Sequence, residues 1–182
     1  ETPAAWWDTP LAELLPFSRS TTDAMVPLEP FVIDPGPAAD SLGVLRLAVG
    51  SEEWWPAELS DPRTGWATFF WGQRIVPDRV KPTAEAIAFA REVITEDVYP
   101  IILTMRYGSG RIAYIGTDEA WRYRFGHGEN LYERFWVPLV RMLGRESLAR
   151  SGTSALLAVS SRQVVVEQPV RITVELVDQE LL

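Results

Sequence analysis

Two short apolar runs joined by a glycine-bearing connection constrain the fold of this chain most. Residues 101–105 and 111–115 each have the length of a strand, and the connection Tyr107-Gly108-Ser109-Gly110 is short enough for a hairpin. A continuous apolar run of this kind is typical of a strand covered on both faces. The sequence therefore predicts two adjacent antiparallel strands. The glycines serve turn geometry rather than phosphate binding, because no helix begins after them.

The clearest helix is predicted at residues 130–145. Gly144 is a candidate for its end, and Pro138 inside it predicts a bend, since proline lacks the N–H that the preceding turn needs. A shorter helix is predicted at residues 8–16, where Thr9 can cap the first turn. Steps of three and four between apolar residues give the longer helix one apolar face: Tyr132, Phe135, Trp136, Leu139, Val140 and Leu143.

Several other segments have the composition of strands. Residues 84–90 suit a buried strand, although their alanines would also suit a helix, and the region 17–64 is rich in Pro, Asp and Ser and is expected to form long loops. After about residue 153 the pattern is purely β. We expect an α/β domain over residues 1–150 and the start of a β-sandwich-like segment over 151–182. The remaining predicted strands are residues 30–33, 44–49, 66–71, 155–159, 164–166 and 170–177.

The residue types that are missing exclude several kinds of chemistry. The chain has no cysteine, which removes disulfides, thiolate metal sites and cysteine nucleophiles together. Its one histidine, His127, lies between two glycines, and no G-x-S-x-G motif occurs. We therefore predict no catalytic residue, no metal site and no cofactor. A net charge of −8 disfavours nucleic acid as a partner, and no apolar run approaches the roughly 20 residues of a membrane helix.

The densest group of reactive side chains follows the second apolar run. Between residues 106 and 145, seven arginines stand against four carboxylates in an otherwise acidic chain. Such a region could hold an anionic or sugar ligand through guanidinium forks and ring faces. Alternatively, the arginines pair with nearby carboxylates or stack on rings to hold a loop, and the acidic pair caps or forms salt bridges. The candidate ligand-binding residues are Asp118, Glu119, Trp121, Arg122 and Arg124.

A family resemblance rests on the block from Pro100 to Arg124 and its continuation to Arg141. This block resembles the class I glutamine amidotransferase-like domains of large membrane-anchored bacterial proteins of the planctomycete type. The resemblance covers about residues 6–146 and is specific around 100–141. It implies a flavodoxin-like three-layer α/β domain, loop-rich and incomplete at its N-terminal side, followed by a short all-β, immunoglobulin-like segment.

Compared with active members of this family, the chain lacks catalytic residues. Where active members carry a histidine and a glutamate, this chain reads Gly116-Thr117-Asp118-Glu119, and it has no nucleophilic cysteine. The sequence thus predicts a non-catalytic pseudoenzyme that binds a small molecule or a neighbouring protein domain. Its setting would be the periplasmic side of a larger envelope protein whose membrane anchor lies outside this chain.

Two other functions stay open at this point. One is a hydrolase that uses Asp118 or Glu119, or an amidotransferase completed by residues outside this chain. Such an enzyme predicts a cleft in which one carboxylate is buried and has a raised pKa. The other is a purely structural module that carries neighbouring domains.

Overall fold

The computed structural model describes residues 3–19, 27–48, 55–108, 110–125, 128–149, 155–159 and 172–176. The chain divides into two compact units, Glu1–Leu143 and Gly144–Leu182. Each unit is described by itself. Among the described residues, no helix combines the length and the apolar character needed to cross a membrane.

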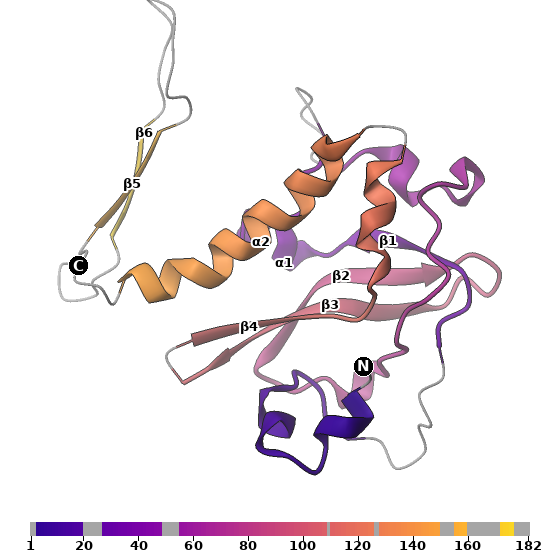
Figure 1. The fold of residues 1–182 in the computed structure, drawn as a ribbon, viewed down its shortest axis with the longest axis horizontal. Coiled ribbons are helices and arrows are strands. Elements are labelled where there is room, and N and C mark those ends of the chain that lie inside the picture. The colour runs from indigo at the N-terminus through magenta and orange to yellow at the C-terminus, as the bar shows by residue number, and fades with distance from the viewer. Residues whose placement is uncertain are drawn as a thin grey trace, which may run out of the picture. The chain divides into compact units, whose positions relative to one another are not determined.

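The first unit is built on a four-stranded sheet whose strands lie in sequence order (Figure 1). The pairing of the last two strands runs from Ile102 with Ile115 to Tyr107 with Gly110, which leaves two residues of sequence between the strands. Gly108 has a φ of 58°, as a tight two-residue hairpin turn requires. The predicted hairpin is confirmed. The strands are β1 (Phe31–Pro35), β2 (Ala84–Glu92), β3 (Val98–Tyr107) and β4 (Gly110–Ile115).

The predicted flavodoxin-like three-layer α/β fold is wrong. Each neighbouring pair in this sheet is antiparallel, and the sheet curls like half a barrel in a mostly β architecture. A flavodoxin-like fold needs parallel strands, and each parallel pair needs a crossover connection that usually contains a helix. Here β2 joins β3 through residues 93–97, and β3 joins β4 through two residues. Connections this short leave no room for a crossover helix.

Helix α2 (Glu129–Ala149) confirms the long predicted helix and contains Pro138, but it continues past Gly144. Its described buried residues are Leu131, Phe135, Leu139 and Met142, whereas Val140 is exposed, so the apolar face is rotated from the predicted one. Near the N-terminus, the Leu11 N–H donates to Thr9 Oγ1 at 3.2 Å, which confirms the predicted cap. The short helices are η1 (Pro3–Trp6), η2 (Pro10–Leu14), α1 (Pro37–Ser41), η3 (Ala57–Ser60), η4 (Pro62–Thr64), η5 (Pro77–Arg79) and η6 (Glu119–Arg124).

Two predicted strands are absent from the described residues. Residues 44–48 are irregular, and Leu45 has a φ of 59°, which no strand allows. Residues 66–71 form only an isolated bridge, between Phe69 and Phe31. The predictions at 30–33 and 84–90 are confirmed by β1 and β2. Val49, the last residue of the predicted strand at 44–49, lies outside the described residues.

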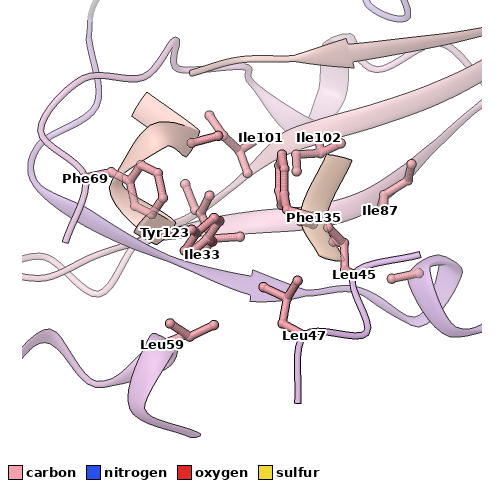
Figure 2. Packing of buried hydrophobic residues seen from close by; sticks show 14 of the residues in the cluster. Ile33, Leu45, Leu47, Leu59, Phe69, Ile87, Ile101, Ile102, Tyr123 and Phe135 are labelled. Atoms are coloured by element: carbon pink, nitrogen blue, oxygen red, sulfur yellow. The ribbon is translucent and has the colours of Figure 1, made fainter. Parts of the chain in front are cut away.

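The two faces of the sheet are covered by different parts of the chain. The larger hydrophobic cluster packs Ile102 with Phe135 of α2 and with residues of the loop region such as Leu45 (Figure 2). The smaller cluster packs Leu103 with Leu15 and other residues near the N-terminus. Ile102 and Leu103 are neighbours in β3, and successive side chains of a strand point to opposite faces. The central strand β3 is therefore covered on both sides, as its apolar run predicted.

The described part of the second unit contains a two-stranded antiparallel pair. β5 (Ala155–Val159) pairs with β6 (Ile172–Leu176), from Ala155 with Leu176 to Val159 with Ile172. The predicted strands at 155–159 and 170–177 are confirmed. The predicted strand at 164–166 lies outside the described residues.

Candidate functional site

The predicted site residues follow β4 on the short helix η6, which is tied to a segment far away in sequence. Thr117 is buried, and its hydroxyl donates to the Trp71 carbonyl at 2.7 Å while accepting from the Glu119 N–H at 3.2 Å. The Gln73 N–H donates to the Gly116 carbonyl at 2.7 Å. Residues 116–119 and 70–73 therefore lie side by side.

The carboxylate of Glu119 completes this connection. Its Oε2 accepts from the N–H groups of Phe70 at 2.5 Å and Trp71 at 2.9 Å, and its Oε1 accepts from Arg122 Nη2 at 2.8 Å. Burial by itself would raise the pKa of Glu119, but the hydrogen bonds from Arg122 and the two main-chain N–H groups outweigh burial and lower that pKa. Glu119 is thus held as a carboxylate that organises two loops.

Arg122 lies between two aromatic rings. Its Cζ is 4.8 Å from the ring centroid of Phe70 and 4.8 Å from that of Trp121, and its side chain is largely buried. Trp121 in turn meets Phe125 edge to face at 5.3 Å. The guanidinium is positioned by Glu119 and stacks on both rings, a geometry that stabilises a cation over π-systems. Both rings therefore contact one guanidinium that Glu119 positions.

Four aromatic residues of these two segments are exposed, and we call them the aromatic surface: Phe70, Trp71, Trp121 and Phe125. Their exposed fractions are 56%, 41%, 40% and 47%. Phe70 and Trp121 both contact the guanidinium of Arg122, and Phe125 contacts Trp121. Large apolar side chains that are exposed and contact one another are candidates for an interaction site. These four residues come from two segments that Glu119 and Thr117 hold together.

Tyr123 anchors the aromatic surface to the core. It is buried and meets Phe69 at 5.5 Å and Phe135 at 5.4 Å between ring centroids (Figure 2). Its hydroxyl has no hydrogen-bond partner among the described residues, and burial, with a smaller contribution from Asp34, raises its pKa. On η6, Tyr123 thus points inward while Trp121 points outward.

The structure brings together three of the five predicted residues: Glu119, Trp121 and Arg122. Asp118 is exposed, and its side chain makes no capping hydrogen bond to η6. Arg124 is directed to the first turn of α2, where it pairs with Glu129 at 3.0 Å and lies 4.0 Å over the ring of Tyr132.

Sequence reasoning missed Phe70 and Trp71, which lie in a segment predicted to be a strand. The run Phe69-Phe70-Trp71 carried a usable signal. A strand alternates its side chains between faces, so three consecutive aromatic residues cannot all enter one core. At least one of them had to be exposed or to pack elsewhere.

Metal binding finds no support in the described part of the chain, where no three carboxylate or histidine side chains gather in a way that could hold an ion. His127 lies outside the described residues. No family model, curated protein or solved structure matches this chain.

Proposed function

We propose that this chain is a non-catalytic interaction domain that binds a protein partner through the aromatic surface. The observation that carries the proposal is the guanidinium of Arg122, positioned by Glu119 between Phe70 and Trp121. Aromatic residues and arginine are the types most enriched among residues that dominate binding energy. In keeping with the sequence, the partner would be a neighbouring domain of a larger envelope protein.

Preorganisation adds to this support. Binding costs free energy whenever flexible side chains become ordered at an interface, roughly 0.5–1.5 kcal/mol for each. Arg122 is already fixed by Glu119, and Trp121 is already in contact with Phe125. A partner that covers these residues therefore has less ordering left to impose.

The state of Glu119 favours binding over proton transfer. An acid or base for catalysis at neutral pH would need a pKa moved toward 7, whereas the pKa of Glu119 is lowered. Its carboxylate also accepts three hydrogen bonds from the protein itself. Both features suit a residue that shapes a surface.

A photo-crosslinking amino acid placed at position 70 tests the proposal in cells that produce the parent protein. The adduct identifies the partner, which is then purified for affinity measurements with the unmodified domain. A crosslinker at position 94, which is also exposed but lies in the β2–β3 connection, is the matched control. We expect an adduct from position 70 and none from position 94.

Affinity then decides whether the aromatic surface carries the binding. Trp121→Ala should weaken the affinity for the partner about 30-fold, which corresponds to a loss of about 2 kcal/mol for a central aromatic contact. Ile94→Ala should leave the dissociation constant unchanged. If Trp121→Ala and Phe70→Ala both fold and bind as tightly as the parent sequence, the aromatic surface is not the binding site.

A further inference from the structure

A second feature lies at the polar end of the sheet face that α2 covers. Glu85 pairs with Thr104, and Arg106 pairs with Arg111. Because side chains alternate along a strand, these four point to the same face as Ile102, which packs in the larger hydrophobic cluster. The apolar part of this face ends where these polar side chains begin.

The polar side chains surround a hollow of about 310 Å³. This volume is at the lower end of the range in which proteins bind small molecules. Three strands or their approaches supply the lining: Thr83 and Glu85 with β2, Thr104, Met105 and Arg106 from β3, and Arg111 from β4. The hollow contains none of the residues of the aromatic surface.

The charges in the hollow favour an anion. Arg106 and Arg111 are directly opposite each other on neighbouring strands. A bound oxyanion between them would accept from both guanidinium groups, in addition to the contacts that these groups already make within the protein. Each guanidinium has five N–H donors, so a contact made within the protein leaves donors for a carboxylate or phosphate group.

Thr104 positions one of the two arginines. It is 1% exposed, and its hydroxyl donates to the Ile112 carbonyl at 3.0 Å. The same oxygen lies 3.4 Å from Arg111 Nη1, which donates to it. The contact with Thr104 thus holds the guanidinium of Arg111, and Glu85 supplies a carboxylate to the same lining.

We propose that this hollow binds a small molecule that carries a carboxylate or phosphate group, with Arg106 and Arg111 as the residues that hold the oxyanion. Glu85 accepts a hydrogen bond from a hydroxyl or amino group of the same molecule. The site is separate from the aromatic surface and does not depend on the function proposed for it.

The test is a titration of the ¹⁵N-labelled full chain followed by NMR. Inorganic phosphate and succinate are added in separate experiments, with sodium chloride adjusted to keep the ionic strength constant. We expect saturable shifts of the amide signals of Thr104, Arg106 and Arg111 with at least one of the two anions. Preference for one anion identifies the group that the site recognises.

Variants distinguish specific binding in the hollow from a general attraction of anions to the protein. Arg111→Ala should weaken binding about tenfold or more, since a hydrogen bond to a charged group contributes roughly 1.5–3 kcal/mol. Arg46→Ala, which removes an exposed arginine paired with Asp40 outside the hollow, should change nothing. Arg106→Ala gives a second variant, at an exposed position, in case Arg111→Ala does not fold.

Two results would overturn the proposal. One is a set of shifts that grow linearly without saturation for both phosphate and succinate. The other is unchanged affinity in folded Arg106→Ala and Arg111→Ala proteins. Either result would mean that the hollow holds no specific anion.

Discussion

At the scale of single residues, Glu92 connects more of the chain than any residue of the predicted site. It ends β2 with no exposed surface, and its carboxylate accepts from Arg74 at 2.6 Å, from the Thr95 hydroxyl at 2.6 Å and from the Glu29 N–H at 3.1 Å. Arg74 also lies 4.9 Å over the ring of Tyr99. One buried charge thus joins three segments that are distant in sequence.

Glu92→Gln should therefore destabilise the protein by about 3 kcal/mol at pH 7, because it leaves a largely buried arginine without its counter-charge. Urea unfolding followed by tryptophan fluorescence measures this difference. Asp40→Asn, which breaks an exposed ion pair with Arg46, is the matched control and should change the free energy of unfolding by less than about 1 kcal/mol.

The same variant should change how stability depends on pH. Burial would raise the pKa of Glu92, but hydrogen bonds from Thr95, Glu29 and Arg74 outweigh it and lower that pKa below its ordinary value of 4.5. A lowered folded-state pKa gives stabilisation that is present above pH 4.5 and is lost as the pH falls through the folded-state value. The difference between Glu92→Gln and the parent sequence should shrink below about pH 4.5. A difference that stays constant down to pH 3 would contradict this account.

At the scale of elements, the sequence predicted those strands and helices that depend on short local patterns. The hairpin of β3 and β4, the strand β2 and the helix α2 each follow from apolar periodicity and turn residues within one short stretch. The segment at 44–48 could not be assigned in this way. Val44, Leu45 and Leu47 are fully buried there without being in a strand, because the core fixes their side chains while the main chain is irregular.

The residues of the candidate site were likewise predicted where they are close in sequence and missed where they are distant. Glu119, Trp121 and Arg122 were predicted together because they are contiguous on one short helix. Phe70 and Trp71 meet them through contacts between distant parts of the sequence, among them the hydrogen bonds to Glu119 that span 49 and 48 residues. A short stretch of sequence cannot indicate a contact between residues that are almost fifty positions apart.

Replacing either of two glycines by alanine should change the stability of the protein, in opposite directions. Directly after β4, a Cβ on Gly116 would lie 2.9 Å from Ile101 Cδ1 and 3.1 Å from the Ile101 carbonyl oxygen. Gly116→Ala should cost about 1–3 kcal/mol through overpacking. In α2, a Cβ on Gly144 would meet nothing within 4 Å, so Gly144→Ala should stabilise the protein by about 0.5–1 kcal/mol. Chemical denaturation of both variants measures the two effects, and equal signs would contradict the packing described here.

At the scale of the whole molecule, the error in fold class came from the family resemblance rather than from the residues. The hairpin at Tyr107-Gly108-Ser109-Gly110 already predicted neighbouring antiparallel strands. A doubly wound fold is built on a mostly parallel sheet, so the two expectations were in tension from the start. The local signal was correct because a two-residue turn leaves the strands no other way to pair.

The core of the first unit predicts how far the chain can be shortened. The described members of both hydrophobic clusters lie between Trp6 and Leu143. A chain that ends at residue 149 should therefore retain the free energy of unfolding of the full sequence within about 0.5 kcal/mol. A chain that ends at residue 130 loses Phe135, Leu139 and Met142 and should not fold cooperatively. Circular dichroism during urea unfolding distinguishes these outcomes, and a large loss in the longer fragment would contradict the prediction.

The order of the strands also bears on how the chain reaches its native state. β2, β3 and β4 are neighbours both in sequence and in the sheet, so they can assemble with little loop-closure entropy and at an early stage. The pairing of β1 with β2 spans the long connection between Pro35 and Ala84, so it costs more loop-closure entropy. We therefore expect this pairing to form after the pairings among β2, β3 and β4. The aromatic surface draws Phe70 and Trp71 from that same connection, so we expect it to form late and to be lost early when the domain opens.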